Sequence, residues 1–126
     1  PNDGFRIGAE PTEEHLRDAR YGFRIAKEIS RLEIGQSVVV KAGTVLAVEG
    51  FEGTDACLTR GGTLAGKDGG AVAVKVAKPK HDMRFDIPCV GLKTVLAFEA
   101  EKTLLLDRKE CEQFLKKHRI TVMAVK

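Results

Sequence analysis

Two loop segments of the sequence carry charged side chains of both signs between strongly apolar stretches. The first spans residues 52–56 and holds Glu52 and Asp55. The second spans residues 78–88, and its titratable members are Lys78, Lys80, His81, Asp82, Arg84 and Asp86. Loops at strand ends are where ligands bind in sheet-based folds. Both segments are therefore candidates for one binding site.

The chemistry of these two loops suits a phosphate ester bound together with a hard cation. Carboxylate oxygens hold magnesium, cationic side chains neutralise phosphate charge, and a spare carboxylate can orient or deprotonate water. The ordinary alternative is that charged loops are simply solvated surface. Residue type and spacing by themselves leave both interpretations open.

Several other motifs have simpler explanations. Residues 61–68 approach the phosphate-loop pattern GxxxxGK[ST], but Asp68 replaces the hydroxyl residue that would hold magnesium. The segment is also expected to follow a helix and enter a strand, the reverse of a working phosphate loop, and we predict a flexible surface connection. The basic residues 116–119 fit a helix C-terminus, where cations are favourable.

The cysteine and histidine residues do not form a metal-binding pattern. Cys57, Cys89 and Cys111 are an odd number without CxxC spacing, which indicates a reducing compartment and neither a disulfide framework nor a zinc site. We expect Cys57 to be a buried, inert thiol. His15 and His118 are expected to be solvated.

The first elements expected along the chain are a helix and a hairpin. Thr12 is placed as an N-cap, and apolar residues at Leu16, Ala19, Phe23 and Ala26 predict a helix that ends near Arg31. The β-branched runs 37–41 and 45–48 then predict two strands joined at Ala42-Gly43.

The remaining pattern mixes helices and strands. A short helix through Leu58 and Arg60 is expected after Thr54 and Asp55, which can cap it. The later segments are predicted as a glycine-rich connection (61–70), strands (71–76, 95–98, 103–106 and 120–125), a loop (78–88) and a helix (107–119). The expected fold class is α/β, a mixed sheet with flanking helices, with α+β as the alternative.

Composition places these elements in one globular domain. The chain has 126 residues, 43% hydrophobic and 31% charged, with a net charge of +3. These values exclude a disordered chain, and the small positive charge with no Trp and one Tyr disfavours nucleic-acid binding. No apolar run approaches the roughly 20 residues of a membrane helix. Residues 1–11 are expected to form an interdomain linker, and residues 12–126 a C-terminal catalytic and substrate-binding domain.

Ordered motifs over more than a hundred residues resemble one enzyme family. They are Ile34-Gly35-Gln36-Ser37-Val38-Val39-Val40, Glu52-Gly53-Thr54-Asp55-Ala56, Lys75-Val76-Ala77-Lys78-Pro79, Arg84-Phe85-Asp86-Ile87-Pro88 and Lys102-Thr103-Leu104-Leu105-Leu106-Asp107-Arg108. The chain resembles the C-terminal domain of the lipid A pathway's UDP-2,3-diacylglucosamine diphosphatase, of the type that is neither a metallophosphoesterase nor a Nudix enzyme.

The resemblance implies a magnesium-dependent hydrolase. Its reaction would be attack of water on the phosphorus next to uridine, giving UMP and 2,3-diacylglucosamine 1-phosphate (lipid X). The implied enzyme is cytoplasmic, works at the inner membrane surface where its acylated substrate lies, and is a homodimer. No nucleic-acid partner is expected.

The resemblance also suggests roles for individual residues. The Arg-Phe-Asp-Ile-Pro segment makes Asp86 the essential carboxylate, and the Glu-Gly-Thr-Asp-Ala segment places Glu52, Thr54 and Asp55 in the same site. With them we assign Lys75, Lys78, Asp82 and Arg84 to substrate binding. The expected magnesium ligands are Asp86 and Asp55.

Two departures from the family pattern matter. Family members carry a further N-terminal domain, so the chain alone is expected to fold, to self-associate and to hydrolyse substrate hardly at all. In addition, residues 91–94 run almost directly into residues 95–98, where the family inserts a short helix, which leaves the sheet order there open. Two alternatives to the hydrolase function stay open. One is a non-enzymatic domain that binds or senses a nucleotide-linked lipid, and the other is a basic module that binds nucleic acid.

Overall fold

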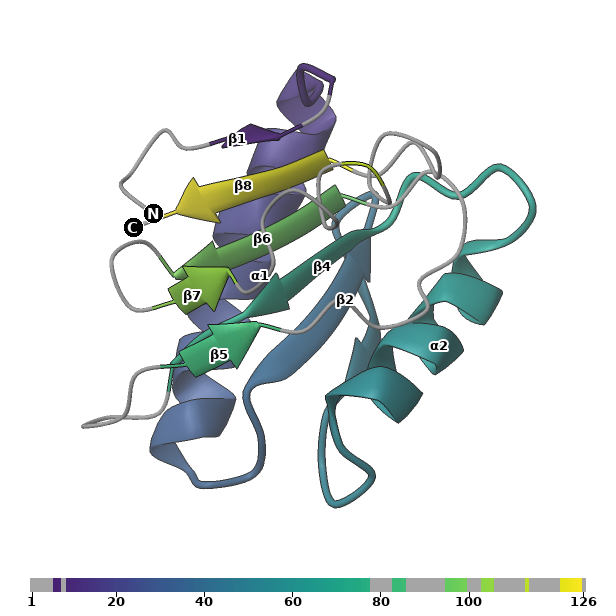
Figure 1. The fold of residues 1–126 in the computed structure, drawn as a ribbon. Helices are drawn as coiled ribbons and strands as arrows, with labels where there is room; N and C mark the ends of the chain where they lie inside the picture. The colour runs from purple at the N-terminus through teal and green to yellow at the C-terminus, as the bar shows by residue number, and fades with distance from the viewer. Residues whose placement is uncertain are drawn as a thin grey trace.

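The chain forms a mixed sheet with a helix on each face (Figure 1). The computed structural model describes residues 9–77, the backbone of five further strand segments and the single residue Gln113. The main sheet has the order β1-β8-β6-β4-β2-β3, and β5 pairs with β7 in a separate two-stranded sheet. The strands are β1 (Arg6–Ile7), β2 (Ser37–Lys41), β3 (Thr44–Val48), β4 (Val72–Lys75), β5 (Met83–Phe85), β6 (Val95–Glu99), β7 (Thr103–Leu105) and β8 (Thr121–Val125). The predicted α/β class is confirmed.

Helix α1 (Glu13–Arg31) begins and ends where the sequence predicts. Thr12 accepts a hydrogen bond from the backbone N–H of His15, and His15 Nδ1 accepts one from the Thr12 N–H, so His15 completes a capping box usually closed by Glu or Gln. The expectation that His15 is merely solvated is therefore incomplete. The buried face of the helix carries small residues at Ala19, Gly22 and Ala26, which allow a close approach to the sheet.

Strands β2 and β3 form the predicted hairpin with its turn at Ala42-Gly43. Both turn residues have positive φ, +48° and +76°. The Asp18 carboxylate on α1 accepts hydrogen bonds from both turn N–H groups, at 2.9 and 2.8 Å, and is only 3% exposed. Asp18 therefore clamps the helix to the hairpin, a role that the sequence patterns did not predict.

Helix α2 (Thr54–Ala65) covers the opposite face of the hairpin from α1. The predicted short helix is correct in position but too short, and the prediction that residues 61–65 form a flexible connection is wrong. Glycines at 61 and 62 suggested a break, but Gly61 is buried against Val39, and a Cβ there would lie 2.5 Å from the Val39 side chain. The glycine serves helix-to-sheet packing, and the connection to β4 begins only at Gly66, the C-cap.

Strands β4, β6 and β8 run parallel to one another, while β2 is antiparallel to β4. The open sheet order after residue 94 is thus resolved: β6 lies between β4 and β8. Strand β5 lies within residues 78–88, which were predicted as a loop, because it pairs in parallel with β7. Strand β1 lies within the predicted linker 1–11 and pairs with β8; whether that segment links two domains stays a prediction.

Two further predictions concern helices. The helix expected over residues 107–119 lies outside the described residues apart from Gln113, which is helical. Among the described helices, neither is long and apolar enough to cross a membrane.

The close packing of α2 on β2 predicts opposite effects for two neighbouring glycines. Gly61→Ala should destabilise the fold by about 1–3 kcal/mol, because the new methyl group overlaps Val39. Gly62→Ala is the matched control: no atom lies within 4 Å of its Cβ position, and a gain of about 0.5–1 kcal/mol is expected from helix propensity. Urea unfolding measures both, and equal effects of the two changes would contradict this packing.

Candidate functional site

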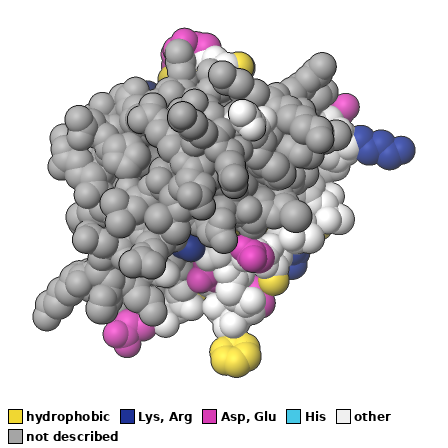
Figure 2. Space-filling model, viewed as in Figure 1, with side chains coloured by type: hydrophobic (Ala, Val, Ile, Leu, Met, Phe, Trp, Pro, Cys, Tyr) yellow, Lys and Arg dark blue, Asp and Glu magenta, His cyan; other side chains and the backbone are white. Residues whose placement is uncertain are grey.

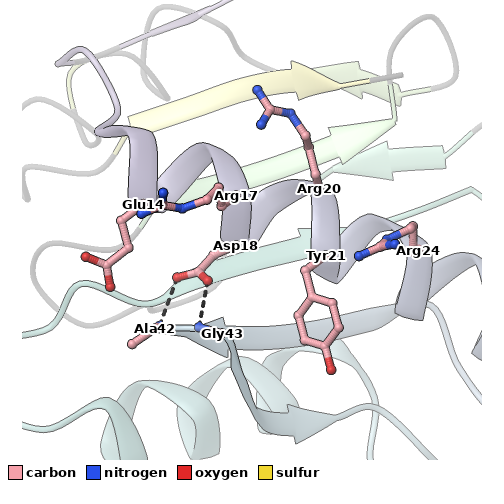
Figure 3. Close-up of a pocket in the computed structure, with 8 residues that line it drawn as sticks. All are labelled: Glu14, Arg17, Asp18, Arg20, Tyr21, Arg24, Ala42 and Gly43. Carbon is pink, nitrogen blue, oxygen red and sulfur yellow. Dashed lines mark hydrogen bonds between the residues drawn. The ribbon is translucent and has the colours of Figure 1, made fainter.

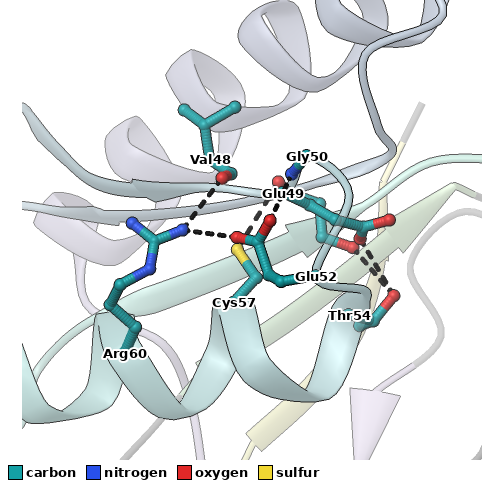
Figure 4. Close-up of polar contacts among 8 residues, drawn as sticks. Val48, Glu49, Gly50, Glu52, Thr54, Cys57 and Arg60 are labelled. Carbon is teal, nitrogen blue, oxygen red and sulfur yellow. Dashed lines mark hydrogen bonds and ion pairs between the residues drawn. The ribbon is translucent and has the colours of Figure 1, made fainter.

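The loop between β3 and α2 holds Glu52 by contacts within the loop and to α2 (Figure 4). Glu52 Oε2 accepts from the Gly50 N–H at 2.9 Å, and Oε1 pairs with Arg60 Nη2 at 2.6 Å. Arg60 also donates to the Val48 carbonyl at 3.0 Å. Hydrogen bonds from the backbone N–H groups of Glu52 itself and of Gly50, and then from Arg60, hold the pKa of Glu52 below its usual value. Glu52 is therefore an ionised, oriented carboxylate at neutral pH.

A partly buried chain of polar side chains, Ser37, Thr54 and Glu49, lies beside this loop. Glu49 is 8% exposed, and its Oε2 accepts a hydrogen bond from Thr54 Oγ1 at 2.9 Å. Thr54 Oγ1 also lies 3.4 Å from the hydroxyl oxygen of Ser37, which is fully buried at the start of β2. Figure 4 shows Thr54 at the first turn of α2, facing the Glu49 carboxylate. Glu49 and Ser37 escaped the sequence predictions, although a Glu directly after an apolar strand was a usable signal.

The first turn of α2 has no side-chain cap. Its N-cap is Gly53, with φ +87°, and among the described residues no side-chain cap hydrogen bond is made there. The alternative that Thr54 and Asp55 only cap the helix is thus not observed: Thr54 bonds to Glu49, and Asp55 is an exposed residue of the first turn. Uncapped N–H groups at a helix N-terminus suit a phosphate oxygen, in chemical terms.

One predicted cation lies at the same end of the sheet. Lys75 is the last residue of β4, is half-buried, and pairs across the sheet with Ser37. The Val76 N–H continues this pairing by donating to the Gln36 carbonyl at 3.0 Å. The register therefore places Lys75 on β4 beside Ser37 of β2, and Ser37 contacts Thr54, which binds Glu49.

The structure describes only part of the predicted site. It places Glu52, Thr54, Asp55 and Lys75 at one end of the molecule, as described above. Lys78, Asp82 and Asp86 lie outside the described residues, and so does the side chain of Arg84, whose backbone is in β5. Their predicted roles stay predictions.

The described residues include no group of three His, Cys, Asp or Glu side chains that could hold a metal ion. Magnesium is commonly held by one or two carboxylates together with substrate phosphates, so a site with few protein ligands is compatible with it. Side chains near the α2 N-terminus offer oxygen atoms of the type that magnesium prefers as ligands. These side chains are Glu49, Glu52, Thr54 and Asp55.

Cys57 faces this region from α2 as a buried thiol. It is fully buried, and burial raises the pKa of its thiol to about 11. The thiol is 3.9 Å from the Ser37 carbonyl, to which it donates. The prediction that Cys57 is buried is confirmed.

A separate open cavity of about 620 Å³ lies at the hairpin end of the sheet, away from Glu52 and Thr54 (Figure 3). Both carboxylate oxygens of Asp18 are already bonded to the hairpin turn there. The Arg24 guanidinium sits 5.9 Å from the centre of the Tyr21 ring. Arg20 points away from Tyr21 in Figure 3, so the arginines do not converge on one point. This cavity is lined mainly by the solvated face of α1.

Comparison with known proteins places the chain in a family. The family model for the LpxI C-terminal domain matches residues 2–123, so the chain belongs to the LpxI C-terminal domain family. It is 37% identical over 121 residues to the UDP-2,3-diacylglucosamine pyrophosphatase LpxI of Caulobacter vibrioides. That match covers 82% of this chain and 43% of the relative. The resemblance identified from sequence motifs is confirmed.

The contacts of Glu52 predict a lowered pKa for its carboxyl group, to which Arg60 contributes in part. Carboxyl ¹³C NMR should show Glu52 titrating below the usual value of about 4.3, and Arg60→Gln should raise its pKa without restoring that value, because the backbone N–H groups remain. Since the pKa is lowered in the folded state, the stabilisation is present above the unfolded pKa and is lost as the pH falls through the folded one.

The control for this titration is Arg31→Gln, which breaks the exposed Glu28–Arg31 pair on α1. That change should leave Glu52 unaffected. A wild-type Glu52 that titrates at its ordinary value would contradict the loop geometry.

Proposed function

We propose that this chain is the part of a UDP-2,3-diacylglucosamine diphosphatase that binds and cleaves the diphosphate, giving UMP and 2,3-diacylglucosamine 1-phosphate. The observation that carries the proposal is the family match over residues 2–123 together with 37% identity to a curated pyrophosphatase of this substrate. The chain spans less than half the length of that relative. We therefore propose that the activity also needs a second domain.

The described geometry supports a diphosphate site at the α2 end of the sheet. An uncapped helix N-terminus and Lys75 offer positive groups for phosphate oxygens. Glu52 is ionised and fixed by Arg60, so it can orient a hydroxyl or amide group of the sugar. We assign the orientation of the attacking water to Asp86, with Lys78, Asp82 and Arg84 completing the substrate contacts.

Magnesium is part of the proposal. Asp55 and Asp86 would hold the ion, and when bound it would supply positive charge to the diphosphate oxygens. The oxygen donors around the first turn of α2 are compatible with such an ion, as argued above.

The finer features of the proposed enzyme concern its surroundings. We propose a cytoplasmic homodimer that acts at the inner membrane surface, since a diacylated substrate resides in a bilayer. Exposed apolar side chains at this end of the molecule are compatible with that setting: Phe51 is fully exposed, and Leu32 and Ile34 are 52% and 49% exposed. Figure 2 shows an apolar group projecting at the lower end, where Figure 1 places the β3–α2 loop.

The test of this function is UMP release from UDP-2,3-diacylglucosamine by the full-length protein, with magnesium and after treatment with EDTA. Turnover should require magnesium and return when the ion is added back. Asp86→Asn should lower turnover by roughly two orders of magnitude or more, because it removes a positioned carboxylate while keeping its shape. Absence of UMP release by the wild type would contradict the proposed reaction. Near-normal turnover of Asp86→Asn would contradict the role assigned to Asp86.

Asp55→Ala separates a site role from a helix-end role. In the site role, turnover falls while the melting temperature is unchanged. A residue that acts only on the helix dipole would instead cost about 0.3–1 kcal/mol of stability and leave turnover intact. Asp68→Ala, at an exposed aspartate beyond the end of α2, is the control and should alter neither quantity.

A further inference from the structure

Two carboxylates of the described region are buried, and the described residues hydrogen-bond them to different extents. Asp18 uses both oxygens to hold the hairpin turn. Glu49 is also almost fully buried, but the hydrogen bond it accepts within the described region comes from one hydroxyl, that of Thr54. Burying a carboxylate is costly unless hydrogen bonds or charges compensate it. Its contact with Thr54 is therefore the described interaction that bears on what Glu49 does.

The contacts of Thr54 determine the direction of its hydroxyl proton. A threonine hydroxyl has one proton and two acceptor lone pairs. Because a carboxylate can only accept, the Thr54 proton must point to Glu49 Oε2. The contact of 3.4 Å between the two hydroxyl oxygens then requires Ser37 to donate to Thr54. The order of donation runs from Ser37 to Thr54 to Glu49.

This order limits what Thr54 can offer to a substrate. Its proton is already used, so it cannot donate to a phosphate oxygen, while one of its lone pairs is left to accept. Thr54 lies at the first turn of α2, beside the uncapped N–H groups that suit a phosphate. The helix N-terminus and the Thr54 hydroxyl therefore present opposite hydrogen-bonding character side by side.

We propose that Glu49 is a positioning residue that turns Thr54 into an acceptor, so that the Thr54–Glu49 pair binds a hydrogen-bond donor rather than a phosphate oxygen. The proposal rests on the proposed function and assigns a part of the same site. The donor is either an N–H or O–H group of the acylated sugar or a water molecule held by magnesium. Each of these two candidates would donate a proton in a hydrogen bond to the free lone pair of Thr54 Oγ1.

The experiment compares four variants of the full-length protein: Glu49→Gln, Thr54→Val, Thr54→Ser and, as control, Asp18→Asn. Steady-state kcat and KM for UDP-2,3-diacylglucosamine are measured at saturating magnesium, and the magnesium concentration for half-maximal rate is measured separately. The shift in melting temperature on adding substrate without magnesium is recorded for each protein.

Glu49→Gln and Thr54→Val are expected to lower kcat/KM about tenfold or more, whereas Thr54→Ser, which keeps the hydroxyl, should stay close to wild type. A raised KM at saturating magnesium identifies the sugar group as the donor. An increased magnesium requirement with unchanged KM identifies the magnesium-held water. Asp18→Asn should lower the melting temperature and leave kcat/KM per folded molecule unchanged.

Other outcomes overturn the proposal. If Glu49→Gln only lowers the melting temperature, as Asp18→Asn does, Glu49 is structural. If Glu49→Gln does not fold, the Thr54→Val and Thr54→Ser pair decides, because equal activities of these two variants contradict a role for the hydroxyl. If the wild type releases no UMP, the proposed function fails; the proposal then stands only if substrate raises the wild-type melting temperature and Thr54→Val loses that shift.

Discussion

The structure depends on the burial of β2 from both sides at very short range. Val38 and Val40 face α1, and Val39 faces α2, so the strand has no solvated face. Each helix approaches through a glycine, Gly22 on α1 and Gly61 on α2, whose missing side chain leaves the space that valine methyl groups fill. Interiors are packed to crystal-like density, so even one methyl group is felt here. This three-layer contact fixes both helices relative to the strand that carries Ser37.

The position of the candidate site follows from that arrangement. Because α2 is held against β2, its first turn lies at the Ser37 end of the strand, and Thr54 reaches both Ser37 and Glu49. Close packing continues there, since a Cβ at Gly35 would lie 2.1 Å from the Glu49 carbonyl oxygen. The opposite end of β2 enters the hairpin turn, which Asp18 of α1 binds. The Asp18 contacts and the candidate site thus lie at opposite ends of β2.

Periodicity and turn chemistry predicted most of the fold. The helix capped by Thr12, the hairpin at Ala42-Gly43 and most strands stood out because their signals are local. Gly61 lies in a helix and not in the predicted connection, since glycine is typical both of turns and of close contacts, and only tertiary packing distinguishes the two. Motifs predicted a shared site for Glu52 and Thr54, whereas the role proposed for Glu49 depends on a hydroxyl five residues away, which a pattern of residue types does not reveal.

The Asp18 clamp also bears on the order of folding. It joins positions 24 and 25 residues apart, while the pairing of β1 with β8 joins Arg6 to Met123. Closing a short loop costs less entropy, and contacts between near neighbours form faster. We therefore expect α1, β2 and β3 to form the nucleus, with the sheet growing outward strand by strand. The pairing of β1 with β8, between positions far apart in the chain, is then the late step.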